Sequence, residues 1–180
     1  MALSATIYVF VIELADSDRG VYETLDLRVA RHPSESAEYL FARVIAYCLE
    51  YTEGIRFSNG LSDPDEPTIA VRDLTGALLS WIDVGAPEPT RLHRASKASP
   101  RVAVYTHKDA AQLAARLSGE RIHRIEALEL YAFDRQWIAS VVERLTRRMT
   151  LSLTVADRNL YLSHGEETLS SIVERVLVGR

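Results

Sequence analysis

The sequence contains one cysteine in 180 residues, so a disulfide framework is excluded. Cys48 lies in an apolar stretch, which is typical of a small core residue rather than of a nucleophile. No apolar run reaches the roughly 18 residues that a membrane span needs, and no basic segment precedes the apolar stretch near the N-terminus. We therefore expect a cytoplasmic protein without a membrane partner.

The signatures of several common chemistries are also missing. The sequence has no Gly-x-Gly-x-x-Gly segment, no Gly-x-x-x-x-Gly-Lys segment and no Gly-x-Ser-x-Gly segment, which disfavours nucleotide cofactors and serine hydrolase activity. The five histidines are scattered, with no pair at metal-binding spacing and none beside a cysteine. A zinc site therefore has little support.

The composition is that of an ordinary globular chain, with 47% hydrophobic and 26% charged residues. No internal repeat or low-complexity linker divides it, so we expect a single domain over residues 1–180. The net charge of −4 is unevenly distributed. Residues 1–90 hold 6 basic and 15 acidic side chains, whereas residues 91–180 hold 15 basic and 10 acidic ones. This segregation fits a protein in which one segment gathers carboxylates for a cation and another meets an anion such as a phosphate backbone.

Hydrophobic periodicity predicts a β-hairpin at each end of the chain. Residues 5–14 are apolar at both parities, residues 16–20 break this strand, and residues 21–29 alternate as a half-buried strand does. A second hairpin is expected from residues 149–155 and 160–162. A helix over residues 35–50, with Ser34 able to cap its first turn, follows the first hairpin.

Between these hairpins the pattern predicts alternating helices and strands. Strands are expected at 55–57, 68–73, 77–84 and 102–105, and a helix at 88–98. A short helix near 110–117, a strand within 122–133 and a helix capped by Asp134 follow. The order predicts an α/β (α+β) fold with a mixed central sheet, flanking helices and an α-β-β-β-α-β core like that of metal-dependent nucleases.

Two acidic positions fall where such a core would bring them together. Glu66 precedes one predicted strand, and Asp83 ends the next. Neighbouring strands bring such carboxylates close, and oxygen ligands suit a hard divalent cation that polarises a phosphodiester. Asp83 shares strand parity with Leu79 and Trp81, so it is either buried and partnered or placed at an exposed strand end.

The sequence also resembles the YaeQ family in a succession of segments that spans nearly the whole chain. The matching segments are residues 1–7 (MALSATI), 30–35 (ARHPSE), 60–62 (GLS), 65–67 (DEP), 81–85 (WIDVG) and 104–106 (VYT).

The resemblance implies a divergent member of the PD-(D/E)XK nuclease-like superfamily without an established activity. Asp65, Glu66 and Pro67 match the acidic-proline signature, and Asp83 matches the acid at the end of the next strand. Glu38 matches a helix acid that often joins such sites. On this basis Glu66, Asp83, Glu38 and Asp65 would hold Mg²⁺.

Three positions, in two segments, depart from the family pattern. The family usually has an Asp after the proline and an aromatic residue shortly beyond, where this chain has Thr68 and Ala70. The basic residue on the following helix is typically a lysine, but the aligned residue here is Arg94, with Lys97 one turn further. An arginine favours bidentate phosphate contact over orienting a water molecule, so the chain would bind phosphate better than it cuts it.

Two functions therefore stay open. In the first, Glu66 and Asp83 with Arg94 or Lys97 catalyse Mg²⁺-dependent phosphodiester hydrolysis. In the second, the protein is a non-catalytic binding or scaffold protein that has kept the fold. A basic stripe that would meet nucleic acid, or would simply form a solvated helix face, comprises Arg91, Arg94, Lys97 and Arg101.

Overall fold

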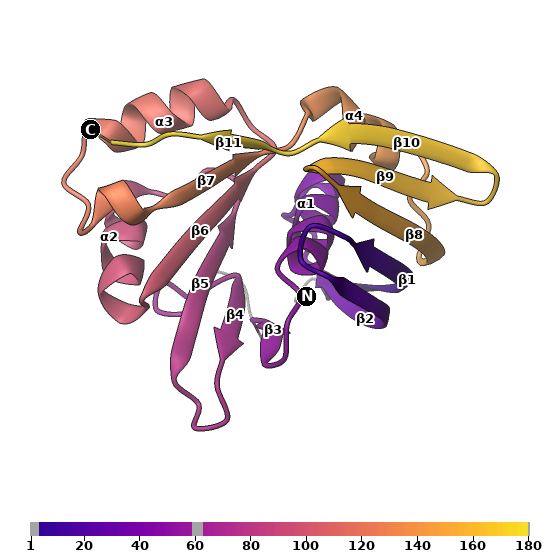
Figure 1. The fold of residues 1–180 in the computed structure, drawn as a ribbon, viewed down its shortest axis with the longest axis horizontal. Helices are drawn as coiled ribbons and strands as arrows, with labels where there is room; N and C mark the ends of the chain where they lie inside the picture. The colour runs from indigo at the N-terminus through magenta and orange to yellow at the C-terminus, as the bar shows by residue number, and fades with distance from the viewer. Residues whose placement is uncertain (1–3, 59–62, 180) are drawn as a thin grey trace. The chain divides into compact units, whose positions relative to one another are not determined.

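The computed structural model describes residues 4–58 and 63–179 (Figure 1). They form two compact units, each built from two separate stretches of the chain. The first comprises the residues up to Phe41 together with Asp134–Val173, and the second comprises Ala42–Phe133 with the residues from Glu174 onward. No helix in the described part of the chain is long and apolar enough to cross a membrane.

The first unit contains a five-stranded sheet in the order β10-β9-β8-β1-β2. Its strands are β1 (Thr6–Asp16), β2 (Val21–Arg31), β8 (Arg148–Ala156), β9 (Asn159–His164) and β10 (Glu167–Ile172). β1 pairs antiparallel with β2 and parallel with β8, so the two predicted hairpins are joined in one sheet. β1 is an interior strand of this sheet, but its buried residues are all even-numbered, and its odd-numbered residues are partly or largely exposed.

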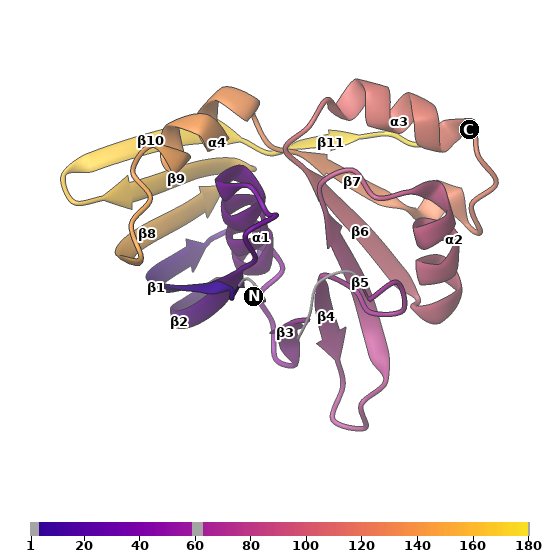
Figure 2. The ribbon, with the colours of Figure 1, turned by 180° about the vertical axis from the view of Figure 1, so that it is seen from behind.

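A helix lies against this sheet near β10. α4 (Arg135–Val142) contacts β10, as Figures 1 and 2 show from opposite sides. The Asp134 side chain accepts a hydrogen bond from the Trp137 backbone N–H, which confirms the predicted N-cap. The Trp137 indole donates to the Leu169 carbonyl at 3.2 Å and ties the helix to β10.

The helix α1 (Ala37–Leu49) begins in the first unit and ends in the second. The predicted helix is confirmed, but the predicted cap at Ser34 is wrong. The Ser36 hydroxyl accepts the Tyr39 N–H at 3.0 Å, whereas the Ser34 hydroxyl bonds to the His32 ring. The helix therefore starts two residues later than the sequence indicated, because the preceding turn uses the first serine.

The second unit contains a six-stranded sheet in the order β11-β7-β6-β5-β4-β3. Its helices are α2 (Pro89–Ala98) and α3 (Ala110–Ser118), with a 3₁₀ turn η1 (Ile125–Ala127). The order α1-β3-β4-β5-α2-β6 agrees with the predicted α-β-β-β-α-β succession. The strands are β3 (Ile55–Phe57), β4 (Ile69–Arg72), β5 (Leu78–Val84), β6 (Arg101–Thr106), β7 (Glu129–Ala132) and β11 (Glu174–Val176).

One buried core cluster of the second unit lies between a face of this sheet and the helices α2 and α3. Trp81 and Val104 from the strands pack in one buried cluster with Leu92 and Leu117 from the helices. Because strand side chains alternate, Asp83 faces the same side as Trp81, and Ser80 faces the other side. The two faces of β5 therefore carry different polar groups.

The predicted mixed central sheet with flanking helices corresponds to the six-stranded sheet of the second unit, whereas the joining of the two predicted hairpins in a five-stranded sheet of their own was not predicted. The second hairpin was also expected to be the last element, but β10 and β11 follow it. Their segments escaped prediction because β10 is largely polar and exposed at a sheet edge, and β11 is only three residues long. Pairing with β9 and β7 makes them strands.

Two glycines with the same φ angle have different surroundings and should respond differently to substitution. Gly54 and Gly76 both have φ of +86°, but a Cβ at Gly54 would lie 2.0 Å from the Arg72 carbonyl oxygen, whereas a Cβ at Gly76 would meet nothing within 4 Å. We expect Gly54→Ala to lower the free energy of unfolding in urea by about 1–3 kcal/mol more than Gly76→Ala, through overpacking against β4. Equal losses would contradict this close approach.

Candidate functional site

The predicted site acid Asp83 is buried and paired with an arginine. Its side chain, near the end of β5, is 2% exposed. Arg91 in the first turn of α2 donates from Nε to Oδ2 at 2.7 Å and from Nη2 to Oδ1 at 3.0 Å. This bidentate contact is the strongest geometry for an arginine and a carboxylate. Of the two positions that the sequence allowed for Asp83, the buried and partnered one is correct.

The same arginine holds the acidic loop that precedes β4. Arg91 donates to the Asp63 carbonyl at 3.1 Å and to the Glu66 carbonyl at 2.7 Å. Thr68 donates its backbone N–H and its hydroxyl to Oδ1 of Asp83, each at 3.2 Å. We call these contacts of Arg91 and Thr68 with Asp83 and with the carbonyls of residues 63 and 66 the Arg91 clamp.

An aromatic ring supports the clamp. The Arg91 guanidinium carbon lies 5.3 Å from the centroid of the Trp81 ring, a cation–π distance. Trp81 and Asp83 share a strand face, so one strand supplies both the charge partner and the aromatic platform. The Thr68 position, which departs from the family pattern, therefore has a structural use as a donor to Asp83.

The other predicted acids have weaker contacts at the surface. Asp65 pairs with Arg94 at 3.2 Å and Glu66 with Arg72 at 3.7 Å, and all four side chains are at least 40% exposed. Exposed pairs of this kind contribute about 0–1 kcal/mol. Glu38 lies in the first turn of α1, in the first unit, and its side chain has no hydrogen bond or ion pair with another described residue.

The donor set does not fit a divalent cation as it is arranged. Both carboxylate oxygens of Asp83 accept from a guanidinium, whose fixed positive charge opposes a second cation. Within residues 4–58 and 63–179, no group of three or more His, Cys, Asp or Glu side chains is placed to hold a metal ion. The magnesium site stays a prediction that this geometry does not favour.

Arg101, predicted to meet nucleic acid, is engaged on the opposite face of the sheet. It donates to Glu50 at 2.6 and 3.0 Å and to Glu129 at 2.6 and 3.2 Å. The Tyr105 hydroxyl donates to Glu50 at 2.5 Å. We call these four side chains the Arg101 network. The N–H groups of Arg101 already donate to these two carboxylates, so few of its donors remain for a phosphate.

The Arg101 network shifts the pKa values of its members. Burial alone would lower the pKa of Arg101, but the hydrogen bonds to Glu50 and Glu129 outweigh burial and raise it. Burial, reinforced by the charge of Glu50, raises the pKa of Tyr105 well above its ordinary value. Burial would raise the pKa of Glu129, but hydrogen bonds from Arg101 and Tyr131 dominate and lower it.

Sequence reasoning missed Glu50 and Glu129 as partners of Arg101. Glu50 directly follows α1 and Glu129 is the first residue of β7, and neither belongs to a recognisable sequence motif. The available signal was the arginine at the start of a buried strand, because a charge in such a place requires a partner.

Arg94 and Lys97 lie on the exposed side of α2. Leu92, Ala95 and Ser96 form its buried side. Lys97 is exposed, and its side chain has no hydrogen bond or ion pair with another described residue. The residues of the predicted basic stripe on α2 therefore do not act together. Arg91 belongs to the Arg91 clamp, whereas Arg94 and Lys97 are exposed to solvent.

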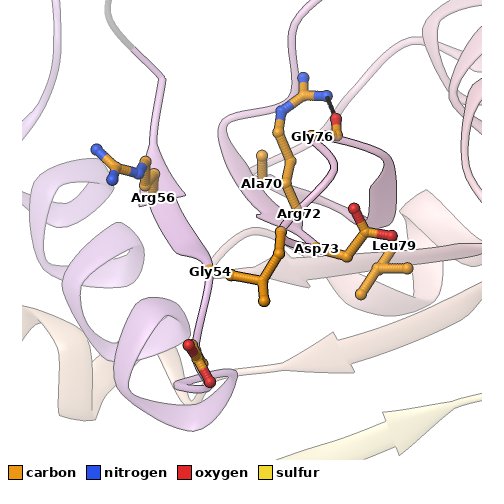
Figure 3. A pocket seen from close by; sticks show the side chains of 9 residues that line it. Gly54, Arg56, Ala70, Arg72, Asp73, Gly76 and Leu79 are labelled. Atoms are coloured by element: carbon orange, nitrogen blue, oxygen red, sulfur yellow. Dashed lines mark hydrogen bonds between the residues drawn. The ribbon is translucent and has the colours of Figure 1, made fainter.

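A cavity of about 680 Å³ lies toward the β3 edge of the sheet (Figure 3). Its lining includes Arg56 from β3, Ala70 and Arg72 from β4, and Leu79 from β5. Strand register places Arg56 and Ala70 on the face that carries Trp81. Arg72 donates to the Gly76 carbonyl at 3.1 Å, and the acids Glu53 and Asp73 balance the two arginines. This mixed lining does not select a ligand by charge.

The clamp predicts a large difference between two aspartates that both pair with α2. Asp83→Asn leaves the partly buried Arg91 without its charge partner, so we expect a loss of about 2–3 kcal/mol in the free energy of unfolding. Asp65→Asn breaks an exposed pair and is expected to cost under about 0.5 kcal/mol. Urea denaturation of the two isosteric variants measures the difference, and similar losses would show that the clamp carries no special weight.

The Arg101 network predicts a pH dependence of stability. Because the pKa of Glu129 is lower in the folded protein than its ordinary value of 4.5, its ionisation stabilises the fold above that value, and this stability is lost as the pH falls through the lower folded value. We expect Glu129→Gln to be less stable at pH 7 and to lose less stability on acidification. Denaturation between pH 7 and 3 tests this against exposed Glu126→Gln, and unchanged slopes for both would argue against the network.

Comparisons with known proteins agree over nearly the full chain. The family model for YaeQ protein matches residues 1–173. The uncharacterized protein YaeQ of Escherichia coli K12 is 32% identical over 170 residues, covering 94% of each chain. The crystal structure of YaeQ protein from Pseudomonas syringae has a TM-score of 0.87 at 25% identity, covering 96% of each chain. YaeQ protein from Xanthomonas axonopodis pv. citri has a TM-score of 0.81 at 26% identity, covering 97% of this chain and 99% of its own. These matches show that the chain belongs to the YaeQ family.

Proposed function

We propose that this protein binds nucleic acid through the phosphate backbone and does not cleave it. The observation that carries the proposal is the pairing of Asp83, whose two carboxylate oxygens are both bound by Arg91. In the catalytic alternative the same carboxylate would have to bind a cation. Asp83 instead neutralises Arg91, which in turn holds the loop before β4, so its role is structural.

The retained architecture supports a binding function. The succession α1-β3-β4-β5-α2-β6 follows the nuclease-like order, and we place the chain in the PD-(D/E)XK superfamily as part of this proposal. Fold alone does not supply function, so the site must carry the argument. At this site, arginines pair with Asp83, Asp65 and Glu66. Among the described residues, no cluster of carboxylates is placed to hold a metal ion.

The basic side chains suited to phosphate lie on the exposed side of α2 and on the segment after α3. The His123 N–H donates to His93 Nδ1 at 3.2 Å, and Arg124 donates to the carbonyls of Ser96 and Ser99 at 2.9 and 3.0 Å. These contacts hold residues 121–124 against α2. We call the resulting group the α2 basic surface; it comprises Arg94, Lys97, Arg121, His123 and Arg124.

Local charge favours this surface over the rest of the chain. Residues 91–124 contain eight basic and two acidic side chains, a balance of +6 within a chain of net charge −4. Lys97 and Arg121 are exposed, and their side chains have no hydrogen bond or ion pair with another described residue. Arg94 is held only by an exposed pair with Asp65, which a phosphate can replace at low cost. A clustered basic patch of this kind is the electrostatic footprint of backbone binding.

Binding is tested by fluorescence anisotropy with labelled single-stranded DNA, double-stranded DNA and RNA in EDTA. We expect affinity to fall as salt rises, because phosphate contacts release counterions. Lys97→Glu/Arg121→Glu should weaken binding at least about tenfold at low salt. The control Arg135→Glu/Arg147→Glu makes the same charge change on exposed residues of the first unit and should weaken binding less. Equal effects of the two double variants, or no binding at low salt, would contradict the proposal.

Turnover is tested on the same nucleic acids with Mg²⁺ or Mn²⁺. We expect no cleavage above background from the wild type or from Asp83→Ala. Cleavage by the wild type that Asp83→Ala abolishes would establish the catalytic alternative. Equal residual cleavage by both proteins would remove Asp83 from any mechanism.

A further inference from the structure

In the described part of the first unit, no helix covers the outer face of the five-stranded sheet. The buried side chains of β1 are even-numbered and face the helices, as the ring centroids of Phe10 and Phe41 lie 5.7 Å apart. Val141 of α4 lines a small cavity together with Met149 and Leu151 of β8, on this same inner face. The odd-numbered residues of β1 and their cross-strand partners therefore form an exposed surface.

Two exposed tyrosines lie in one row across this outer face. Strand register places Tyr22 of β2 opposite Ala15 of β1. Ala15 pairs with Thr154 of β8, which in turn pairs with Tyr161 of β9. The tyrosines are 65% and 42% exposed, and three strand spacings place them about 14 Å apart. We call these four residues the tyrosine row; its two rings stand at either end of a strip of small side chains.

Unpaired polar groups lie along the tyrosine row. The neighbouring row of the face, two residues along each strand, contains Thr24, Glu13 and Ser152. The side chains of these three residues and of Thr154 make no hydrogen bond or ion pair with another described residue. Hydroxyl groups donate and accept hydrogen bonds, and an ionised carboxylate accepts them. The surface therefore offers hydrogen-bonding groups beside two aromatic rings.

The charges on this face disfavour a phosphate at the tyrosine row. Of the described residues in the two rows, only Glu13 carries a charge. The arginines of the outer face, Arg28 and Arg148, both lie opposite Val9. Val9 precedes Ala15 by six residues, a distance of about 20 Å along β1. Surfaces that stack the bases of a single strand also place basic side chains along its backbone, and this row lacks them.

The two turns nearest the tyrosine row add no net positive charge. Asp16 pairs with Arg19 at 2.8 Å. Asp18 accepts hydrogen bonds from the backbone N–H groups of Asp157 and Arg158, at 2.7 and 2.9 Å. Residues 16–20 and 157–158 together carry three aspartates and two arginines, a balance of −1. A ligand that stacks on the tyrosines here is therefore favoured when it is not an anion.

We propose that the tyrosine row binds a neutral, linear oligosaccharide. The apolar faces of sugar rings pack on Tyr22 and Tyr161, and sugar hydroxyls exchange hydrogen bonds with Glu13, Ser152 and Thr154. One sugar ring reaches only one tyrosine, so a chain of several rings is needed to contact both. The inference does not depend on the proposed function, since the α2 basic surface lies in the second unit.

Binding is tested by NMR titration of the ¹⁵N-labelled full chain with maltohexaose, cellohexaose and glucose. We expect at least one hexasaccharide to shift the backbone amides of the tyrosine row and to bind at least about tenfold more tightly than glucose, because only the longer chains reach both rings. Tyr22→Ala and Tyr161→Ala should each weaken hexasaccharide binding at least about fivefold, the loss of one stacked ring. Tyr22→Phe keeps the ring and should retain most of the affinity.

Ile7→Ala is the matched control. Ile7 is 41% exposed on the same face but lies opposite Ala30, far along β1 from the tyrosine row, so its truncation should leave hexasaccharide binding unchanged. Urea denaturation verifies that each variant is folded. Equal losses for this control and the two tyrosine variants, or no shifts with either hexasaccharide at about 10 mM, would overturn the proposal. Tyrosine-dependent binding of a single-stranded oligonucleotide instead of the sugars would also overturn it, by making the row a base-stacking surface.

Discussion

The buried pair between Asp83 and Arg91 is the constraint on which the candidate site depends. A carboxylate at 2% exposure must be neutralised, and the guanidinium does so in a bidentate geometry. The remaining donors of Arg91 hold the carbonyls of Asp63 and Glu66, so the same charge that satisfies the strand also fixes the loop. One arginine thereby connects β5, α2 and the segment before β4.

The second unit shows how strand alternation separates two polar systems that are adjacent in sequence. Asp83 on β5 faces the helices with Trp81, and Ser80 faces the side of Arg101. Each system is internally satisfied: the clamp by an arginine and a threonine, and the Arg101 network by two glutamates and a tyrosine. In our proposal, a phosphate of nucleic acid would contact the solvent side of α2.

Membership of the YaeQ family is consistent with this division. The TM-scores of 0.87 and 0.81 to two YaeQ crystal structures show that this chain shares their overall fold. The Thr68 and Arg94 positions, at which this chain departs from the expected pattern, both make contacts here: Thr68 donates to Asp83, and Arg94 pairs with Asp65. Their identities therefore fit a site organised by hydrogen bonds and ion pairs.

The sequence by itself determined most of the helices and strands, because hydrophobic periodicity reports local burial, but it missed β10 and β11. It located the first hairpin, the helix α1, the strands around Asp83 and the Asp134 cap, and it recognised the family from ordered short segments. It did not reveal that β1 pairs with β8, that Arg91 rather than a cation meets Asp83, or that Arg101 meets Glu50 and Glu129. Those facts join residues distant along the chain, and only tertiary packing decides which charges share a buried space.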